Sequence, residues 1–244
     1  MSDKLSPASA PVVPAAEPRR RARPAGTAAA ASAGPATRPR NPEETQRQIL
    51  KAARAEFCEK GFDGARVDAI AERAGANKRL LYHYFGNKEA LYCAVLEAAY
   101  REIREGERGL SLDRSEPEEA MDRLIRFTFR HFLEKPWFIS LLTTENLHGA
   151  RFLKTLKDIP ALHSPLVGQL ETLIERGAEK GVFRSDVDPI QLYITIAALG
   201  WFYVSNMATL SVIFDRDLRD FAMVQEREAH CVAVVMDFLR ARRS

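Results

Sequence analysis

Residues 62–91 read FDGARVDAIAERAGANKRLLYHYFGNKEAL, and this stretch decides the fold of the first part of the chain. Two short segments with helical spacing of apolar residues meet at Gly75, and the second begins with Asn77, Lys78 and Arg79. A short helix, a glycine turn and a second helix with a basic start are typical of the helix-turn-helix motif, whose second helix lies in the major groove of DNA. The pattern therefore predicts a DNA-binding segment.

Cationic and aromatic side chains are interleaved in the second of these segments. Between Asn77 and Lys88 there are three cationic residues and no acidic one, and Tyr82, His83 and Tyr84 lie among them. Such a mixture suits contact with phosphates and base edges. The composition therefore favours binding to nucleic acid over simple exposure to water.

Apolar spacing predicts the helices around the turn. A helix is predicted from Asn41, as its N-cap, to Gly61, with Glu44 at the acidic position of a capping box. The second helix is predicted from about Val67 to Ala74. The expected core-facing residues of the three helices are Ile49, Leu50, Ala53, Phe57, Val67, Ile70, Ala71, Ala74, Leu81 and Phe85. In this arrangement the cations of the third helix face outward.

The remainder of the chain also has helical spacing. Asn87 is the predicted N-cap of a fourth helix that reaches about Gly106, long enough to connect two domains. The further predicted helices are Met121–Phe132 with a stop at Pro136, Trp137–Leu147, Arg151–Leu156, Pro165–Lys180 with a stop at Gly181, Pro189–Phe214 and Ala222–Arg240. No stretch alternates polar and apolar residues over a useful length, so no strand is predicted. We therefore expect an all-α chain.

Residues 1–41 differ in composition from the rest. They contain twelve Ala, seven Pro and six Arg, and no aromatic residue. Such a stretch buries too little apolar surface to offset its ordering entropy, which predicts a disordered basic arm. The lack of a continuous apolar run excludes a secretory signal. A transit peptide, an arm whose Arg38 and Arg40 enter a minor groove, and a merely solvated tail remain open.

Charge is distributed unevenly along the chain. The formal net charge is +3, and it divides into +5 for residues 1–41, +2 for residues 42–88 and −4 for residues 89–244. Positive charge thus accompanies the predicted DNA-binding segment, while the body is mildly acidic and not attracted to phosphate. The three cysteines and five histidines have no zinc-ligand spacing. Reduced thiols, no metal and no cofactor are therefore expected.

Residues 189–214 form an uncharged stretch of 26 residues. Its length would satisfy a membrane span, but Asp188 and Asp215 flank it, polar residues interrupt it, and no basic cluster marks one end. A helix that is apolar on every face is otherwise buried on every face. We therefore expect one side on the core of the protomer and the other on a second subunit. The final helix is the expected second element of that interface, through Ala222, Val224, His230, Val234, Val235 and Phe238.

The stretch from Ile49 to Leu91 resembles the tetracycline-repressor (TetR) family of bacterial transcription regulators. The matching residues are Ile49, Ala53 to Phe57, Gly61-Phe62, Ile70-Ala71, Ala74-Gly75, Leu81-Tyr82, Tyr84-Phe85 and Asn87-Lys88-Glu89-Ala90-Leu91. The resemblance implies a three-helix DNA-binding head, a connecting fourth helix and a helical body that dimerises. It also implies a small molecule that enters the body and moves the two heads out of register with their DNA half-sites.

The resemblance further implies roles for single residues. Lys78 and Arg79 match positions that contact bases, and Tyr82, Tyr84 and Lys88 match positions that usually hold phosphate.

Two positions depart from the family pattern. Arg66 stands where many members have Ser or Thr, so the usual hydroxyl cap is missing and a long cation is free to reach phosphate. Leu80 stands where Thr or Ser is frequent, and it can contact a thymine methyl group but cannot donate a hydrogen bond. The complete set of expected DNA-contacting residues is Arg66, Asn77, Lys78, Arg79, Leu80, Tyr82, His83, Tyr84 and Lys88.

A second set of residues is expected to line a ligand cavity in the body, because cavities combine aromatic side chains with a few polar groups. The set is Trp137, Phe138, Leu141, Asn146, His148, Trp201, Tyr203 and Asn206. Ordinary core packing is the alternative for each of them. The expected effector is small and largely apolar.

These features predict a basic arm at 1–41, a DNA-binding domain at 42–88, and an effector-binding and dimerisation domain at 89–244. The predicted function is that of a cytoplasmic, homodimeric repressor, released from a palindromic operator by a small molecule. A constitutive or partner-controlled DNA-binding regulator is the alternative. No G-x-S-x-G, H-E-x-x-H or phosphate-cradling glycine loop occurs in the sequence, so an enzyme is not expected.

Overall fold

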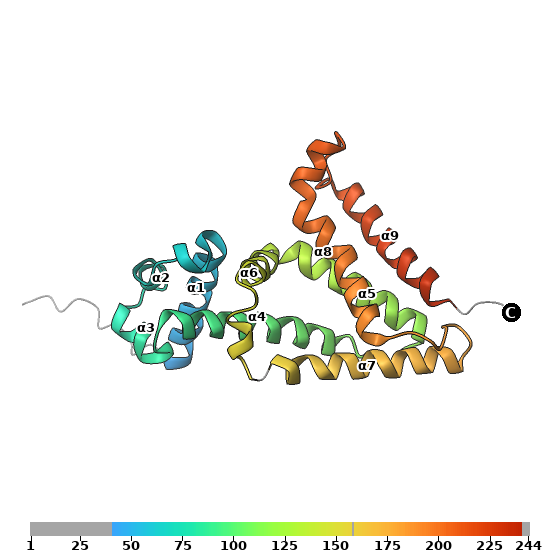
Figure 1. The fold of residues 1–244 in the computed structure, drawn as a ribbon, viewed down its shortest axis with the longest axis horizontal. Coiled ribbons are helices and arrows are strands. Elements are labelled where there is room, and N and C mark those ends of the chain that lie inside the picture. The colour runs from blue at the N-terminus through green and yellow to red at the C-terminus, as the bar shows by residue number, and fades with distance from the viewer. Residues whose placement is uncertain (1–40, 158, 241–244) are drawn as a thin grey trace, which may run out of the picture. The chain divides into compact units, whose positions relative to one another are not determined.

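The computed structural model describes residues 41–157 and 159–240, which belong to one compact unit, 40–244. The elements, in chain order, are α1 (Pro42–Gly64), α2 (Val67–Arg73), α3 (Lys78–Phe85), α4 (Lys88–Gly109), α5 (Pro117–Glu134), α6 (Pro136–Leu147), the 3₁₀ turn η1 (Leu153–Thr155), α7 (Ile159–Glu179), α8 (Pro189–Ile213) and α9 (Phe221–Leu239) (Figure 1). Within these ranges the only extended pairing is an isolated bridge between Phe183 and Arg240. The all-α prediction is confirmed. The predicted arm, with Arg38 and Arg40, lies outside the described residues.

The first helix begins where the sequence predicts. The side chain of Asn41 accepts a hydrogen bond from the backbone N–H of Glu43 at 3.1 Å, which confirms the N-cap. Glu44 does not complete the predicted capping box, because its carboxylate accepts hydrogen bonds from the side chains of Arg47 and Gln48. The acid in the first turn is therefore used for pairing along the helix surface.

Gly61 bends α1 but does not end it. Its φ of 68° lies in the left-handed region that favours glycine, and one further helical turn follows, to Gly64. That turn buries Phe62, whose ring centroid lies 4.3 Å from that of Phe152. The predicted stop is therefore three residues short, because aromatic packing continues the helix beyond the kink.

The turn between α2 and α3 has the geometry that the sequence predicts. Gly75 has a φ of 59°, which glycine adopts without a side-chain clash. Ile70 and Leu81 are fully buried on either side of it. Asn77 is the N-cap of α3, since its side chain accepts a hydrogen bond from the N–H of Leu80 at 2.7 Å. The two helices are thus held in a fixed relation around the turn.

The fourth helix connects the helix-turn-helix to the rest of the protein. Its N-cap is Asn87, as predicted, with the N–H of Ala90 donating at 2.7 Å. It contacts α1 and α3, and further along it packs against α5 and α7 (Figure 1). The predicted buried stripe is confirmed, and its members are Leu91, Val95, Ala99 and Ile103.

The predicted helix at Arg151–Leu156 is wrong, because only the short turn η1 forms there. The carboxylate of Glu145 accepts hydrogen bonds from the backbone N–H groups of Phe152 and Leu153, at 2.8 and 2.9 Å. A side chain thereby satisfies donors that a longer helix would have satisfied internally.

The predicted start of α7 at Pro165 is also wrong. The helix begins at Ile159, and Pro165 lies inside it. Pro160 suits a first helical turn, and Leu166, Leu170 and other apolar residues anchor the helix to the core. The stability gained from that packing offsets the loss of the backbone hydrogen bond that a proline within a helix cannot donate. Gly181, with a φ of 71°, follows the helix as predicted.

The eighth helix has two different apolar faces. One is buried against the protomer, through Leu192, Ile196, Gly200, Tyr203 and Val204. At Gly200 a Cβ atom would lie 3.2 Å from the ring of Phe132, so the glycine permits close approach to α5. The helix is long and apolar enough to cross a membrane by length and composition alone. Its packing against α5 accounts for one face, as the sequence predicts for a buried helix.

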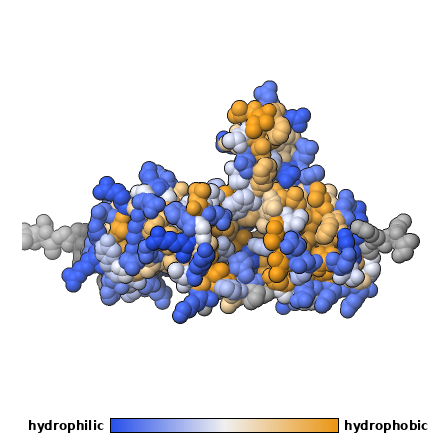
Figure 2. All heavy atoms as spheres, in the orientation of Figure 1, coloured by the Kyte–Doolittle hydropathy of each residue, from blue (hydrophilic) through white to orange (hydrophobic). Residues whose placement is uncertain are grey.

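The second face of α8 is exposed. Ile190, Ile194 and Phe202 are each more than half exposed, and Ala198 lies between them at the same four-residue spacing. The end of α8 and the start of α9 expose further apolar side chains, in the projecting part of the molecule where Figure 2 shows an orange patch below its blue top. In α9, Val235 is fully buried in its own protomer. It is therefore not available to a subunit interface, in contrast to the sequence-based expectation.

Candidate functional site

The outer side of α3 presents most of the expected DNA-contacting residues to solvent. Lys78, Arg79 and His83 are exposed, and Tyr82 is 40% exposed. Leu81 on the opposite side is fully buried and fixes the rotation of the helix about its axis. A two-turn helix with one buried side and one cationic and aromatic side matches the dimensions of a recognition helix in a major groove.

The first cation of α3 already has a partner on α2. The Nζ atom of Lys78 lies 2.9 Å from Oδ1 of Asp68, and both side chains are about half exposed. The hydrogen bond and the charge of Asp68 raise the pKa of Lys78 above its ordinary value. The ion pair partly offsets the unfavourable placement of a cation at a helix N-terminus.

The residue before α2 bonds to a buried acid of α1 but does not cap the helix with its side chain. Arg66 stands at the N-cap position without a side-chain capping bond, and its backbone N–H donates to Oε1 of Glu56 at 3.3 Å. Glu56 is 4% exposed and also pairs with Arg73 of α2 at 3.4 Å. The residue Arg66 is itself exposed. The structural role of Glu56 was not predicted from sequence, because an acidic residue in an amphipathic helix is usually exposed to solvent.

Other members of the expected set have structural roles beside any contact with DNA. Lys88 is half-buried, with Nζ 3.3 Å from the carbonyl oxygen of Asp63 and 4.8 Å from the ring centroid of Phe62. Asn77 is occupied as the N-cap of α3. Tyr84 is half-buried with its ring edge-to-face on His83. Phosphate contact from these positions would therefore add to packing that exists without DNA.

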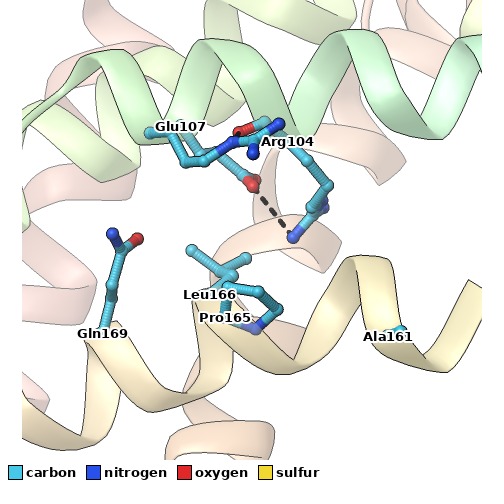
Figure 3. A pocket seen from close by; sticks show the side chains of 7 residues that line it. Arg104, Glu107, Ala161, Pro165, Leu166 and Gln169 are labelled. Carbon is cyan, nitrogen blue, oxygen red and sulfur yellow. Dashed lines mark hydrogen bonds and ion pairs between the residues drawn. The ribbon is translucent and has the colours of Figure 1, made fainter.

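A second site lies between α4 and α7. A cavity of about 70 Å³ is lined by Arg104, Glu107, Arg108, Ala161, Pro165, Leu166 and Gln169. Figure 3 shows the side chains of Arg104 and Glu107 on α4 opposite Pro165, Leu166 and Gln169 on α7. Arg104 is 4% exposed and Glu107 is 1% exposed, so a buried ion pair forms one wall. Charged side chains are buried only rarely, and a cavity beside them is a candidate binding site.

Burial changes the protonation of the acid in this wall. Nη1 of Arg104 lies 2.8 Å from Oε2 of Glu107, and Nη2 of Arg104 donates to the hydroxyl of Tyr193 at 2.7 Å. Burial raises the pKa of Glu107 to about 7, although the charge of Arg104 opposes the shift. Beside this ion pair, Nε of Arg104 and Oε1 of Glu107 are buried without a hydrogen-bond partner among the described residues. The pair thus leaves one donor and one acceptor atom unsatisfied in the interior beside the cavity.

The eight residues expected to line a ligand cavity are dispersed. None of them lines the α4–α7 cavity. Phe138 and Leu141 are buried in the core, Trp201 packs on Phe132, and Trp137 lies beneath the guanidinium of Arg54. Asn146 is exposed.

The polar members of the same set are occupied elsewhere. His148 bonds to Asp63 and to the carbonyl of Thr144, and Asn206 donates to the carbonyl of Phe202. Tyr203 donates to the carbonyl of Leu218 and lines a separate depression on α8 and α9.

Metal-ligating side chains do not gather in the part of the chain that the structure describes. The three cysteines are free thiols, of which Cys231 is buried while Cys58 and Cys93 are half-buried. Burial raises the pKa of Cys58 to about 11, so its thiol is protonated near neutrality.

A helix-turn-helix with an exposed basic second helix, joined by α4 to a helical body, defines a DNA-binding regulator. Two family models match the chain: "Bacterial regulatory proteins, tetR family" over residues 49–95 and "Tetracyclin repressor-like, C-terminal domain" over residues 117–235. The protein belongs to the TetR family of bacterial transcription regulators.

Individual relatives agree with this assignment. The HTH-type transcriptional repressor NicS of Pseudomonas putida is 39% identical over 178 residues, which is 73% of this chain and 84% of the relative. The HTH-type transcriptional repressor SCO4008 of Streptomyces coelicolor is 32% identical over 164 residues, which is 66% of this chain and 80% of the relative. The crystal structure of SCO4942 from Streptomyces coelicolor has a TM-score of 0.62 at 25% identity, and the match covers 81% of this chain and 99% of that one. The protein is accordingly a DNA-binding transcription regulator.

Proposed function

We propose that this regulator is a repressor that binds a near-palindromic operator as a homodimer and leaves it when a small molecule occupies the α4–α7 cavity. One observation carries the proposal. The helix α4 contacts α3 and α1 over its first part, and it supplies the buried Arg104–Glu107 wall of the cavity further along. A ligand that displaces this part of α4 therefore acts on the helix that supports the recognition helix.

The DNA contacts proposed here follow the exposure of α3. Lys78 and Arg79 read bases, and Leu80 contacts a thymine methyl group. Phosphate contacts come from Arg66, Asn77, Tyr82, His83, Tyr84 and Lys88. Support comes from the exposed, acid-free face of α3, which carries several of these side chains.

A second copy of the chain is the proposed partner of α8 and α9. The row Ile190, Ile194, Ala198 and Phe202 is exposed, uncharged and parallel to the buried stripe of the same helix. Homodimer interfaces are the more apolar class of interface, and a two-fold axis would pair this row with itself. The relatives NicS and SCO4008 are named repressors, which supports repression, and not activation, as the effect of this regulator.

The remaining parts of the proposal follow from this assignment. Residues 42–88 form the DNA-binding domain and residues 89–244 the effector-binding and dimerisation domain, with 1–41 as a basic arm. The protein acts in the cytoplasm, where its DNA target lies, and it works by binding and not by catalysis. A regulator without a small-molecule effector, acting constitutively or through a protein partner, is the alternative.

Selection of a duplex from a random library, followed by a compound screen for DNA release, tests the proposal. The selected duplex should contain two inverted half-sites, as expected for a symmetric dimer. A compound that releases DNA must bind more weakly in the presence of saturating operator, by the same factor that it weakens DNA binding. Equal affinity with and without operator for every binding compound would favour the constitutive or partner-controlled alternative.

A further inference from the structure

The ion pair between Lys78 of α3 and Asp68 of α2 is accessible to a ligand. Nζ of Lys78 lies 2.9 Å from Oδ1 of Asp68, and the two side chains are 49% and 60% exposed. An ammonium group has three N–H donors and a carboxylate has two acceptor oxygens, so one hydrogen bond saturates neither group. The pair therefore presents a donor and an acceptor side by side on the surface.

The two parts of DNA differ in what they offer to this pair. A phosphate has acceptors only and carries a negative charge, so it attracts Lys78 but is repelled by Asp68. A base edge in the major groove offers donors as well as acceptors and carries no net charge. Base edges are therefore the part of DNA that both residues can bind together.

The spacing of the pair matches that of a base pair. In the major groove an amino group of one base lies beside a carbonyl oxygen of its partner, and the hydrogen bond between them holds their heavy atoms about 2.9 Å apart. A base or phosphate that binds Lys78 alone must draw it away from Asp68, whereas such an edge binds both residues with their contact in place.

The order of the groups selects the base pair. If the base nearest Lys78 is written first, G·C and T·A present an acceptor to Lys78 and a donor to Asp68, whereas C·G and A·T present them in reverse. Beside O6, guanine has N7 as a second acceptor for the ammonium group. In T·A the ammonium group meets the thymine methyl group, and the carboxylate meets the acceptor N7 of adenine. G·C therefore fits the pair best.

We infer that Asp68 is a specificity-determining residue of the DNA-binding domain: while Lys78 donates to O6 and N7 of a guanine, the carboxylate of Asp68 accepts a hydrogen bond from the N4 amino group of the paired cytosine. This inference rests on the proposed function, in which Lys78 reads a base of the operator. It adds a residue of α2 to the reading residues of α3, and it assigns one G·C pair in each half-site.

Duplexes selected from a random library by the full-length protein locate this base pair. Each half-site should contain one G·C pair whose preference disappears when the selection is repeated with Lys78→Ala. In the selected operator, the cytosine of this pair is then replaced by 2-pyrimidinone, which lacks the N4 amino group. We expect the unaltered protein to bind the substituted duplex about tenfold more weakly than the operator. Asp68→Ala should bind both duplexes alike.

The design separates contact with the base from other roles of Asp68. Operator and substituted duplex carry the same charge, so repulsion between Asp68 and phosphate cancels in the ratio of the two affinities. Glu72→Ala removes an exposed acid from the same helix and should keep the loss seen with the unaltered protein. An equal loss for the unaltered protein and Asp68→Ala would show that Asp68 only holds Lys78 in place, and would overturn the inference. No loss for the unaltered protein would overturn it without any variant.

The selection also distinguishes failure of the inference from failure of the proposed function. Inverted half-sites without a G·C pair that depends on Lys78 would overturn the inference, while binding of a palindromic operator by a homodimer would stand. A selection that yields no inverted half-sites would contradict the proposed function itself, and the inference with it.

Discussion

The Nζ atom of Lys78 lies 2.9 Å from Oδ1 of Asp68, so the first cation of the recognition helix is paired with an acid of the preceding helix. A DNA phosphate or base that approaches Lys78 must compete with this carboxylate. Asp68 is itself exposed and lies beside the proposed DNA-binding face, where its charge opposes phosphate. The pair therefore lowers general attraction to DNA while it holds Lys78 in position.

Replacement of Asp68 by Asn should strengthen DNA binding at low salt. The change removes a repelling charge and frees Lys78, which reads a base in the operator but can contact a phosphate in random duplex. For random duplex the slope of log affinity against log salt should therefore become steeper by about 0.9. Fluorescence anisotropy with operator and with random duplex, from low to high salt, measures both quantities. Glu72→Gln is the matched control, since it removes an exposed acid from the same helix. An equal gain in both variants would mean that net charge alone is responsible.

Two cations of the proposed interface should behave differently when removed. Arg79→Ala should lose about 1–3 kcal/mol of operator binding and relax the choice of base at one position of each half-site. Lys88→Ala should weaken operator and random DNA alike and reduce the salt slope by about one unit. Because Lys88 also contacts Phe62 and Asp63, thermal unfolding of this variant must be measured alongside. If both variants bind like the unaltered protein, α3 is not the recognition helix.

The helix-turn-helix and the two apolar faces of α8 were predictable from sequence because single residues carry strong local signals. Gly75 and the caps Asn77 and Asn87 set helix boundaries by backbone geometry and one hydrogen bond each. The stretch without charges from residue 189 to 214 needed two apolar partners, and the structure supplies one of them in α5.

The cavity could not be predicted in the same way, because its wall is made of residues that usually face solvent. Arg104 and Glu107 lie within α4, and extending the apolar stripe at Val95, Ala99 and Ile103 by four residues reaches Glu107. A glutamate in line with a buried apolar stripe is therefore the one sequence feature that could have predicted a buried titratable group at Glu107. The aromatic residues predicted to line a cavity instead pack on each other, because rings bury large areas wherever the core allows.

An ion-pair cluster joins α5 to α9. The carboxylate of Glu228 accepts hydrogen bonds from Arg130, at 2.5 and 3.1 Å, and from Arg126 at 3.4 Å. Glu228→Ala should lower the free energy of unfolding by about 1 kcal/mol, since both arginines remain partly hydrated in the variant. Urea denaturation measures the change. Asp237→Ala removes an exposed pair with Arg240 and should stay within about 0.5 kcal/mol. An equal loss in both variants would contradict a special role for Glu228.

A charge on the exposed row of α8 should prevent dimerisation. Ala198 lies between Ile194 and Phe202 in that row, and an aspartate there would be buried without a partner in a two-fold interface. Light scattering at micromolar concentration should show a monomer for Ala198→Asp, with its helical circular dichroism retained. Thr172→Asp adds the same charge at an exposed position of α7 and should remain a dimer. A monomeric unaltered protein would contradict the proposed interface at once.

The contact between α6 and the end of α1 should depend on pH through His148. Its Nδ1 lies 2.8 Å from the carbonyl oxygen of Thr144 and its Nε2 lies 3.2 Å from a carboxylate oxygen of Asp63. Both neighbours are acceptors, so both ring nitrogens donate only when the imidazole is protonated. The hydrogen bond to Thr144, followed by that to Asp63, raises the pKa of His148 above its ordinary value of 6.5.

A raised pKa in the folded state means that the stabilising contribution of His148 is fully present below pH 6.5 and is lost as the pH rises through the folded-state pKa. The difference in unfolding free energy between the unaltered protein and His148→Gln should therefore be larger at pH 6 than at pH 8, as measured by urea denaturation. His131 and His163 do not disturb this comparison, because burial lowers the pKa of each to about 4 and both are present in the two proteins. A pH-independent effect of His148→Gln would show that the neutral ring makes the same contacts, and the contribution of His148 to the link between α1 and α6 would then not depend on its charge.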